Sequence, residues 1–336
     1  MTEALFYSKH QDNRIICRLC PHECSIANGK HGICRVRKNI DGVLISENFG
    51  KLSAIHLDPI EKKPLYHYYP GSHILSVGSV GCNMQCQFCQ NCEISQSGVA
   101  GFPALKSYLP RDIVELAART HNNLGIAYTY NEPTVFYEFM LEISALVSAN
   151  NLRNVVVTNG FIAEEPFQKL LEYADAFNID LKSFEDDFYR KYTHSALEPV
   201  KKSLVRVRKS GRHLEITNLI IPGLNDDEAI FREMVKWIAG ELGPATVLHL
   251  SRYFPRHRMT IESTPLKLLE KNYFIAREFL TYVYMGNVAG GEGQDTYCAG
   301  CKSLAIERRG YQIVLRGVAA NGSCIHCGQH IVIRNK

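Results

Sequence analysis

Twelve cysteines fall into three groups of four along this chain of 336 residues. Within each group most neighbouring thiols are separated by two or three residues, a spacing that suits wrapping around a metal better than pairing as disulfides. A secreted disulfide framework is the alternative, and the large size of the chain and the lack of an apolar signal segment in residues 1–15 speak against it. The three groups are Cys17, Cys20, Cys24 and Cys34; Cys82, Cys86, Cys89 and Cys92; and Cys298, Cys301, Cys324 and Cys327.

The composition otherwise describes an ordinary globular protein. Hydrophobic residues make up 46% of the chain, enough for a sizeable core, and the formal net charge of +4 is too small to indicate a nucleic-acid or acidic membrane partner. The longest apolar runs, such as 219–221, are far too short to span a bilayer. We therefore expect a cytoplasmic protein with no specific nucleic-acid partner and no membrane contact.

The middle of the chain alternates strand and helix patterns. About six such repeats predict a parallel sheet with right-handed crossovers, which either stays open or curls into a barrel. The strand candidates are 73–78, 125–130, 154–158, 176–181, 213–221 and 246–251, and the helix candidates are 111–121, 134–148, 165–174, 227–242 and 266–282.

Reactive residues follow most of these strands. The second cysteine group follows the first strand, and polar residues end the second, third, fourth and sixth strands. Because the C-terminal ends of parallel strands meet at one edge, these residues are expected to form one site. The polar residues are Asn131, Glu132, Asn159, Asp180, Lys182 and Arg252.

The second cysteine group contains the motif CxxxCxxC at Cys82, Cys86 and Cys89. Three thiolates on one tight loop can ligate three irons of a 4Fe–4S cluster and leave the fourth iron open, where the amine and carboxylate of S-adenosylmethionine (SAM) can bind. One electron from such a cluster breaks the sulfonium C–S bond and yields a 5′-deoxyadenosyl radical. A zinc loop is the alternative, as is a cluster with Cys92 as its fourth protein ligand.

Several segments together resemble the radical SAM superfamily, and within it the AmmeMemoRadiSam-system enzymes, which are relatives of the pyruvate formate-lyase activating enzymes. The resemblance implies a partial (β/α)6 TIM-like barrel, a reductant such as flavodoxin or ferredoxin, and Memo-like and AMMECR-like partner proteins. The segments are DPIEKKPLYH (58–67), GCNMQCQFCQN (81–91), AYTYNEPT (127–134), VVTNG (156–160), FNIDLKSF (177–184), LIIPGLND (219–226) and HLSRYFP (249–255).

The resemblance also implies contacts to SAM, although no catalytic residue is assigned. Glu132 would meet the ammonium group, or would instead be an acid favoured at a helix N-terminus. Asp180 and Lys182 would serve the SAM carboxylate, or form a simple surface ion pair. Thr217 departs from the arginine that activating enzymes often carry there. The other expected contacts are Asn131, Thr158, Asn159, His249 and Arg252, with a structural role as the alternative for His249.

The outer cysteine groups predict two small metal modules. The C-terminal group is a paired CxxC signal, typical of a zinc ribbon or rubredoxin-like module, with a strand at 311–318 and a turn at Asn321-Gly322. Zinc is the expected metal, and iron is the alternative. The N-terminal group predicts a second four-thiolate site for zinc or for an auxiliary iron–sulfur cluster.

The expected organisation is α/β throughout: an N-terminal four-cysteine module (1–40), a connecting segment (41–72), the radical SAM partial barrel (73–289) and the C-terminal module (290–336). Three functions are compatible with it. The first is hydrogen abstraction from an unidentified substrate, and the second is an activase that installs a glycyl radical on a partner enzyme. The third is a zinc-rich scaffold without catalysis, in which all twelve thiolates would hold only zinc.

Overall fold

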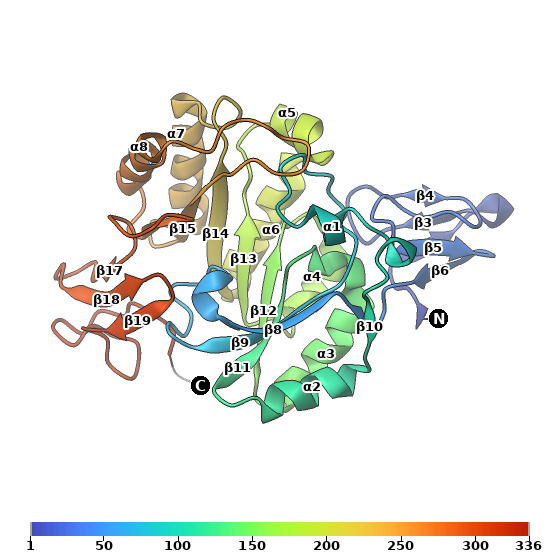
Figure 1. The fold of residues 1–336 in the computed structure, drawn as a ribbon, viewed down its shortest axis with the longest axis horizontal. Coiled ribbons are helices and arrows are strands. Elements are labelled where there is room, and N and C mark those ends of the chain that lie inside the picture. The colour runs from blue at the N-terminus through green and yellow to red at the C-terminus, as the bar shows by residue number, and fades with distance from the viewer. Residues whose placement is uncertain (1, 335–336) are drawn as a thin grey trace.

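A computed structural model describes residues 2–334 and shows one central sheet of eight strands (Figure 1). The spatial order is β16-β15-β14-β13-β12-β11-β9-β8, so that seven strands run parallel in chain order and β8 is antiparallel at the edge. The strands are β8 (Ala54–Pro59), β9 (His73–Gly78), β11 (Asn123–Tyr128), β12 (Arg153–Thr158), β13 (Ala176–Asp180), β14 (His213–Ile220), β15 (Val247–Arg252) and β16 (Val283–Gly286).

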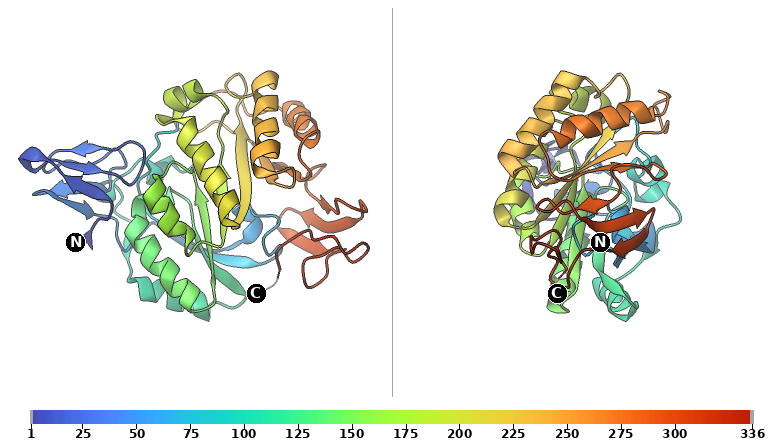
Figure 2. Two further views of the ribbon diagram at one scale, coloured as in Figure 1. Left: turned by 180° about the vertical axis from the view of Figure 1, so that it is seen from behind. Right: turned by 90° about the vertical axis from the view of Figure 1, so that its left-hand side faces the viewer.

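Helices connect successive parallel strands and cover one face of the sheet (Figure 2). The edge strands β8 and β16 do not pair, so the barrel stays open, as the partial-barrel prediction requires. The connecting helices are α2 (Pro110–Arg119), α3 (Tyr137–Ala149), α4 (Glu164–Leu171), α6 (Leu197–Ser210), α7 (Glu228–Trp237) and α8 (Leu266–Arg277), and shorter ones are α1 (Cys92–Ser95) and α5 (Asp186–Phe188).

All six predicted strands and all five predicted helices are present, with bounds that differ by a few residues. Helix α6, strand β16 and strand β8 were not predicted. The buried side chains of α6 include Leu197, Val200, Leu204 and Val207, which have helical spacing, so its pattern was readable. Strand β8 lies within the segment expected as a connection, and it joins the sheet through antiparallel pairing.

The lower interior of the half-barrel is filled by residues 60–69, which we call the plug. Its Leu65 and Tyr68 pack in one buried cluster with Ile74, Val155 and Ala176, which lie near the N-terminal ends of their strands. The apolar part of the plug thus packs at the end of the half-barrel opposite the predicted site. Its first residues, Lys62 and Lys63, extend to the site itself.

A buried carboxylate anchors the plug to the sheet. Glu215 on β14 accepts hydrogen bonds from the backbone N–H groups of Tyr66 and His67 at 2.9 and 2.7 Å. It also pairs with the ring nitrogens of His213 at 2.9 Å and His249 at 2.6 Å. Burial opposes its charge, but the hydrogen bonds from the two histidines hold the pKa of Glu215 well below its usual range.

We expect Glu215→Gln to lower the free energy of unfolding by about 3–5 kcal/mol, because it removes one member of a buried charged network and leaves donors unpaired. Urea unfolding followed by circular dichroism measures the loss. The matched control is Glu47→Gln, which breaks the partly exposed Glu47–His31 pair at 2.7 Å and should cost less than about 1 kcal/mol. Equal losses in both variants would contradict the anchoring role.

The two cysteine-rich modules lie at opposite ends of the sheet (Figure 1). Their short strands pair within each module, apart from β7 with β10 near the first strand of the barrel. They are β1 (Thr2–Glu3), β2 (Tyr7–Lys9), β3 (Ile15–Cys17), β4 (Ser25–Ile26), β5 (Arg37–Ile40), β6 (Val43–Ser46), β7 (Lys51–Leu52) and β10 (Lys106–Ser107), then β17 (Thr296–Tyr297), β18 (Leu304–Arg309) and β19 (Gln312–Leu315).

The C-terminal hairpin lies earlier in the chain than the predicted strand and turn. Strand β18 pairs with β19 across Gly310, and the predicted strand at 311–318 narrows to Gln312–Leu315. The turn at Asn321-Gly322 is present, but it leads into the second pair of cysteines and does not close the hairpin. Among residues 2–334, no helix is both long and apolar enough to cross a membrane.

Candidate active site

A cavity of about 540 Å³ lies at the C-terminal ends of the parallel strands, where the sequence predicts the site. The thiols of Cys82, Cys86 and Cys89 all line it. Cys92 does not line it, because it begins helix α1 beyond the loop. The volume lies within the range of about 300–1,000 Å³ usual for small-molecule sites.

Asparagine side chains fix the cysteine loop to the strand ends. Asn131 accepts from the N–H of Ser79 at 3.0 Å and donates to the carbonyl of Gly81 at 2.9 Å. Asn159 donates to the side-chain oxygen of Asn83 at 2.9 Å and lies 3.8 Å from the Sγ of Cys82. Both asparagines therefore position the loop, in addition to lining the cavity.

A second set of bonds holds the loop from the other side. The backbone N–H groups of Gln85 and Gln87 donate to the carbonyls of Thr193 and Tyr192 at 2.8 and 3.0 Å. These acceptors belong to the segment between β13 and α6, which contains α5 and a π-helical turn at Tyr189–Thr193. The thiol positions are thus fixed by three separate βα connections.

Glu132 is a buried carboxylate in the wall of the cavity. Its Oε1 accepts from the hydroxyls of Thr134 and Thr158 at 2.6 and 2.7 Å, and its Oε2 accepts from the N–H of Asn159 at 2.8 Å. All its donors are neutral, and no lysine, arginine or histidine within residues 2–334 forms an ion pair with it. Burial raises the pKa of Glu132. A cationic ligand in the cavity would supply the missing countercharge.

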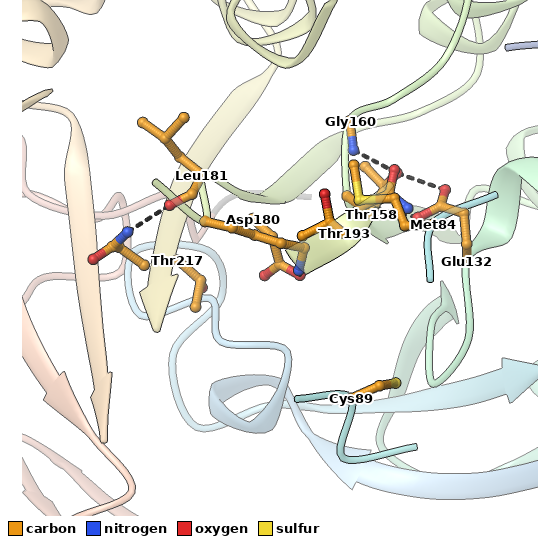
Figure 3. A network of polar contacts seen from close by, with 12 residues as sticks. Met84, Cys89, Glu132, Thr158, Gly160, Asp180, Leu181, Thr193 and Thr217 are labelled. Atoms are coloured by element: carbon orange, nitrogen blue, oxygen red, sulfur yellow. Dashed lines mark hydrogen bonds and ion pairs between the residues drawn. The ribbon is translucent and has the colours of Figure 1, made fainter. Parts of the chain in front are cut away.

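Asp180 at the end of β13 (Figure 3) and Lys182, two residues later, line the cavity. The Nζ of Lys182 lies 2.8 Å from Oδ2 of Asp180, and the ammonium also lies above the ring of Phe88. Burial opposes the charge of Lys182, but Asp180 and the nearby Cys86 raise its pKa. Thr217 lies beside Asp180 on the neighbouring strand β14, and its hydroxyl donates to Asn178 at 2.9 Å. The pair is therefore built into the site and is not a surface ion pair.

Two predicted contacts lie elsewhere. His249 is buried beneath the cavity, does not line it, and pairs with Glu215 in the anchor of the plug. Arg252 lines a neighbouring hollow of about 390 Å³ that shares Gln90, Leu219 and Asn287 with the main cavity. The structure thus brings together six of the eight expected SAM contacts and places His249 in a structural network, which was the alternative stated for it.

The structure adds a polar network that had no role in the sequence analysis. Lys63 and Tyr130, both in the cavity wall, bond to Oδ2 of the buried Asp58 at 2.6 and 2.5 Å. Lys62 bonds to the other carboxylate oxygen at 2.9 Å. Burial opposes its charge, but these bonds hold the pKa of Asp58 well below its usual range. Asp58, Lys62 and Lys63 lie together in the segment 58–67, but Tyr130, which also bonds to Asp58, follows a different strand and carries no local signal of this contact.

The four C-terminal cysteines form a compact set near the end of the chain. All four sulfurs lie within 4.8 Å of one another, with 3.5 Å between Cys298 and Cys327 and 3.6 Å between Cys301 and Cys324. A tetrahedral ion with metal–sulfur bonds of about 2.3 Å requires sulfurs about 3.8 Å apart. This set therefore fits one tetrahedral metal ion.

Comparison with known proteins agrees with this geometry. Residues 76–237 match the family described as the Radical SAM superfamily. The chain belongs to the radical SAM superfamily. It is 42% identical to an uncharacterized protein of Methanocaldococcus jannaschii, across 99% of both chains. It is also 21% identical to the pyruvate formate-lyase-activating enzyme of Clostridium pasteurianum, across 52% of this chain and 75% of that enzyme.

A further activating enzyme and one solved structure extend the comparison. The (2S)-3-sulfopropanediol dehydratase activating enzyme of Klebsiella oxytoca is 22% identical over 35% of this chain and 38% of its own length. A radical SAM methyltransferase of Sphaerobacter thermophilus superposes with a TM-score of 0.51 at 16% identity, across 68% of this chain and 71% of that chain. That likeness shows the radical SAM fold alone.

The radical SAM fold implies a 4Fe–4S cluster and SAM, and the residues of this cavity fit both. Three thiols face one space, and the Sγ of Cys82 accepts the N–H of Met84 at 3.3 Å. Lys182 places a cation beside Cys86, and Glu132 offers a carboxylate without a countercharge. Among the described residues, this triad lacks a fourth thiol in the cavity wall, which leaves room for a ligand at one iron.

Proposed function

We propose that this protein is a radical SAM enzyme that abstracts hydrogen from its substrate. Cys82, Cys86 and Cys89 hold the 4Fe–4S cluster, and Glu132 receives the ammonium group of SAM. The cluster with SAM supplies one-electron cleavage of the sulfonium to a 5′-deoxyadenosyl radical. The observation that carries the proposal is the meeting of three thiols and an uncompensated carboxylate in one cavity.

The chain's own residues orient and enclose the ligand. Glu132 is held by four hydrogen-bond donors, and the Asp180–Lys182 pair adds both charges two strands away along the same edge of the sheet. Asn131 and Asn159 hold the cysteine loop in a fixed position relative to the strand ends. Arg252 in the adjoining hollow lies where a second reactant would enter.

The deciding experiment is anaerobic purification with iron, sulfide and zinc counting, followed by reduction in the presence of SAM. We expect 5′-deoxyadenosine to form in proportion to the iron bound at the triad. Iron-replete protein that yields no 5′-deoxyadenosine would overturn the proposal. Twelve thiols that hold only zinc would favour the scaffold function.

Replacement of Glu132 by Gln should weaken SAM binding by about 10- to 100-fold, because one charge-assisted hydrogen bond is lost in a buried site. Isothermal titration of the anaerobic, cluster-loaded protein with SAM measures the dissociation constant. The matched control is Glu142→Gln, an exposed acid on α3 that should leave affinity unchanged. Unaltered affinity in Glu132→Gln, with iron content retained, would remove Glu132 from the binding role.

A second candidate function is the installation of a glycyl radical on a partner enzyme, and the partial similarity to activating enzymes favours it. It predicts one 5′-deoxyadenosine released per activated partner and a radical stored on that partner, which electron paramagnetic resonance detects. Catalytic release of 5′-deoxyadenosine over many cycles with a small molecule would contradict it.

We further propose zinc at the C-terminal set, a flavodoxin- or ferredoxin-like reductant, and partners of the Memo and AMMECR types. The sulfur spacing fits a tetrahedral ion, for which zinc is our proposal, and the segments quoted from the sequence support the partners. Co-purification of the full chain with candidate Memo-like and AMMECR-like proteins tests the last point, and no complex at micromolar concentration would contradict it.

A further inference from the structure

We propose that Cys17, Cys20, Cys24 and Cys34 hold an iron–sulfur cluster and not a zinc ion, and that Arg37 donates an N–H hydrogen bond to it. All four cysteines line one hollow of the N-terminal module, at the end of β3 and in the loops that precede and follow β4. Its remaining walls are mostly apolar. The four thiols therefore share one enclosed space.

The spacing of the thiols separates the two metals. Outside the C-terminal set, no group of three or more Cys, His, Asp or Glu in the stretch 2–334 brings its ligand atoms within 4.8 Å of one another. A single zinc ion needs its sulfurs about 3.8 Å apart, whereas a cubane spreads its thiolates farther. The N-terminal thiols are thus spread more widely than those of the compact C-terminal set.

A buried guanidinium faces the same hollow. Arg37 is 1% exposed and lines the hollow with the four thiols. Its Nη2 donates to the carbonyl of Leu5 and its Nη1 forms an ion pair with Glu138 at 3.0 Å, but Nε lacks a hydrogen-bond acceptor among the described residues. Buried N–H groups normally find acceptors. The sulfides and thiolates of a cluster would accept this bond.

The hollow adjoins the cysteine loop of the active site. Asn83, next to Cys82, lines the hollow, and its carbonyl contacts the ring of His22 at 2.7 Å. A side chain at Gly81 would collide with the carbonyl of Cys34, so the two loops pack backbone against backbone. The N-terminal cluster could accept an electron from a low-potential donor protein at a place that is separated from Cys82 only by Asn83. Transfer of that electron to the active-site cluster would return the N-terminal cluster to its oxidised state. Zinc, which is redox-inert, would make no use of this placement.

The test uses the full chain with Cys82, Cys86 and Cys89 all replaced by Ala, reconstituted anaerobically with iron and sulfide. We expect about four irons and four sulfides per chain and a reduced-cluster resonance, and both should vanish when Cys17 and Cys20 are also replaced by Ala. Iron-free protein with about two zinc ions per chain would overturn the proposal. Should the variant not fold, the unaltered protein gives the same decision: about eight irons support it and about four oppose it.

These counts do not depend on the proposed function, because they require neither SAM nor turnover. For Arg37, the readout is the midpoint potential of the N-terminal cluster in the triad-free chain. We expect Arg37→Gln to shift it downward, since a donor and a positive charge are lost, and Arg37→Lys to shift it less. Lys38→Gln is the control, because neighbouring strand residues point to opposite faces and Lys38 lies near Glu47. An unshifted potential in an iron-replete Arg37→Gln variant would overturn the role of Arg37.

Discussion

Replacement of Cys86 by Ala is expected to abolish 5′-deoxyadenosine formation and to lower the iron content by about four per chain. Two thiols cannot hold a cubane in place, and the loop offers no substitute in the cavity wall. Cys86 is the thiol to replace in this experiment. Lys182 lies near it and stays ion-paired with Asp180, so its ammonium would lose the neighbouring thiolate. The measurement is chromatography of the reaction after anaerobic reduction with SAM, together with iron and sulfide counting.

Cys92→Ala is the matched control for that experiment. Cys92 belongs to the same run of thiols, but it begins α1 and does not line the cavity. Its replacement should leave both iron and product unchanged. Loss of the cluster in this variant would make Cys92 a ligand and would reverse the assignment of an open iron. Retention of both in Cys86→Ala would remove the radical mechanism altogether.

The second large effect is expected from Cys324→Ser. This buried thiol belongs to the compact set, and structural zinc in small modules contributes about 10 kcal/mol or more of apparent free energy. The core of the module contains few other apolar residues, so that metal loss should unfold residues 296–334. Limited proteolysis and zinc release during thermal unfolding measure the change.

The damage should extend beyond the module. The guanidinium of Arg308 donates to the carbonyl of Tyr66 at 2.9 Å, and the carbonyl of Ile331 contacts the ring of His67 at 2.8 Å. Tyr66 and His67 belong to the plug, so its protection from hydrogen exchange should fall in Cys324→Ser. The control is His326→Ala, an exposed residue between two ligands, which should keep its zinc. Full zinc in Cys324→Ser would show that the set is not a metal site.

Local patterns predicted the sheet well, because most of the parallel strands that were predicted combine a short apolar run with a polar end. The site at the strand ends followed from topology, since residues after successive strands must converge. Glu132, Asp180 and Lys182 line one cavity for that reason. The plug was not predicted, because its fixed conformation depends on Glu215, which lies about 150 residues away and carries no local signal.

His249 shows the same limit. Its position near the C-terminal end of β15 suggested a ligand contact. Its structural partner, the buried carboxylate of Glu215 on β14, is visible only in the folded chain. The spacing of the N-terminal cysteines in the sequence was also not enough to predict which metal they would hold. A run of four cysteines suits zinc and iron–sulfur clusters alike, and the separation of the sulfurs and the orientation of Arg37 exist only in the folded chain.

The plug has a consequence for the order of biosynthesis. It precedes the first parallel strand in the sequence, yet His67 meets Ile331 across 264 residues and Tyr66 meets Glu215 across 149. A ribosome releases the chain from its N-terminus, so the bond to Glu215 cannot form until residue 215 has emerged, and the bond to Ile331 forms later still. Leu65 and Tyr68 meet Ile74, Val155 and Ala176 earlier, but the polar bonds that fix the plug wait for these distant residues, as is common where non-local contacts dominate. Residues such as Ile331 therefore complete an interior whose first residues were made long before.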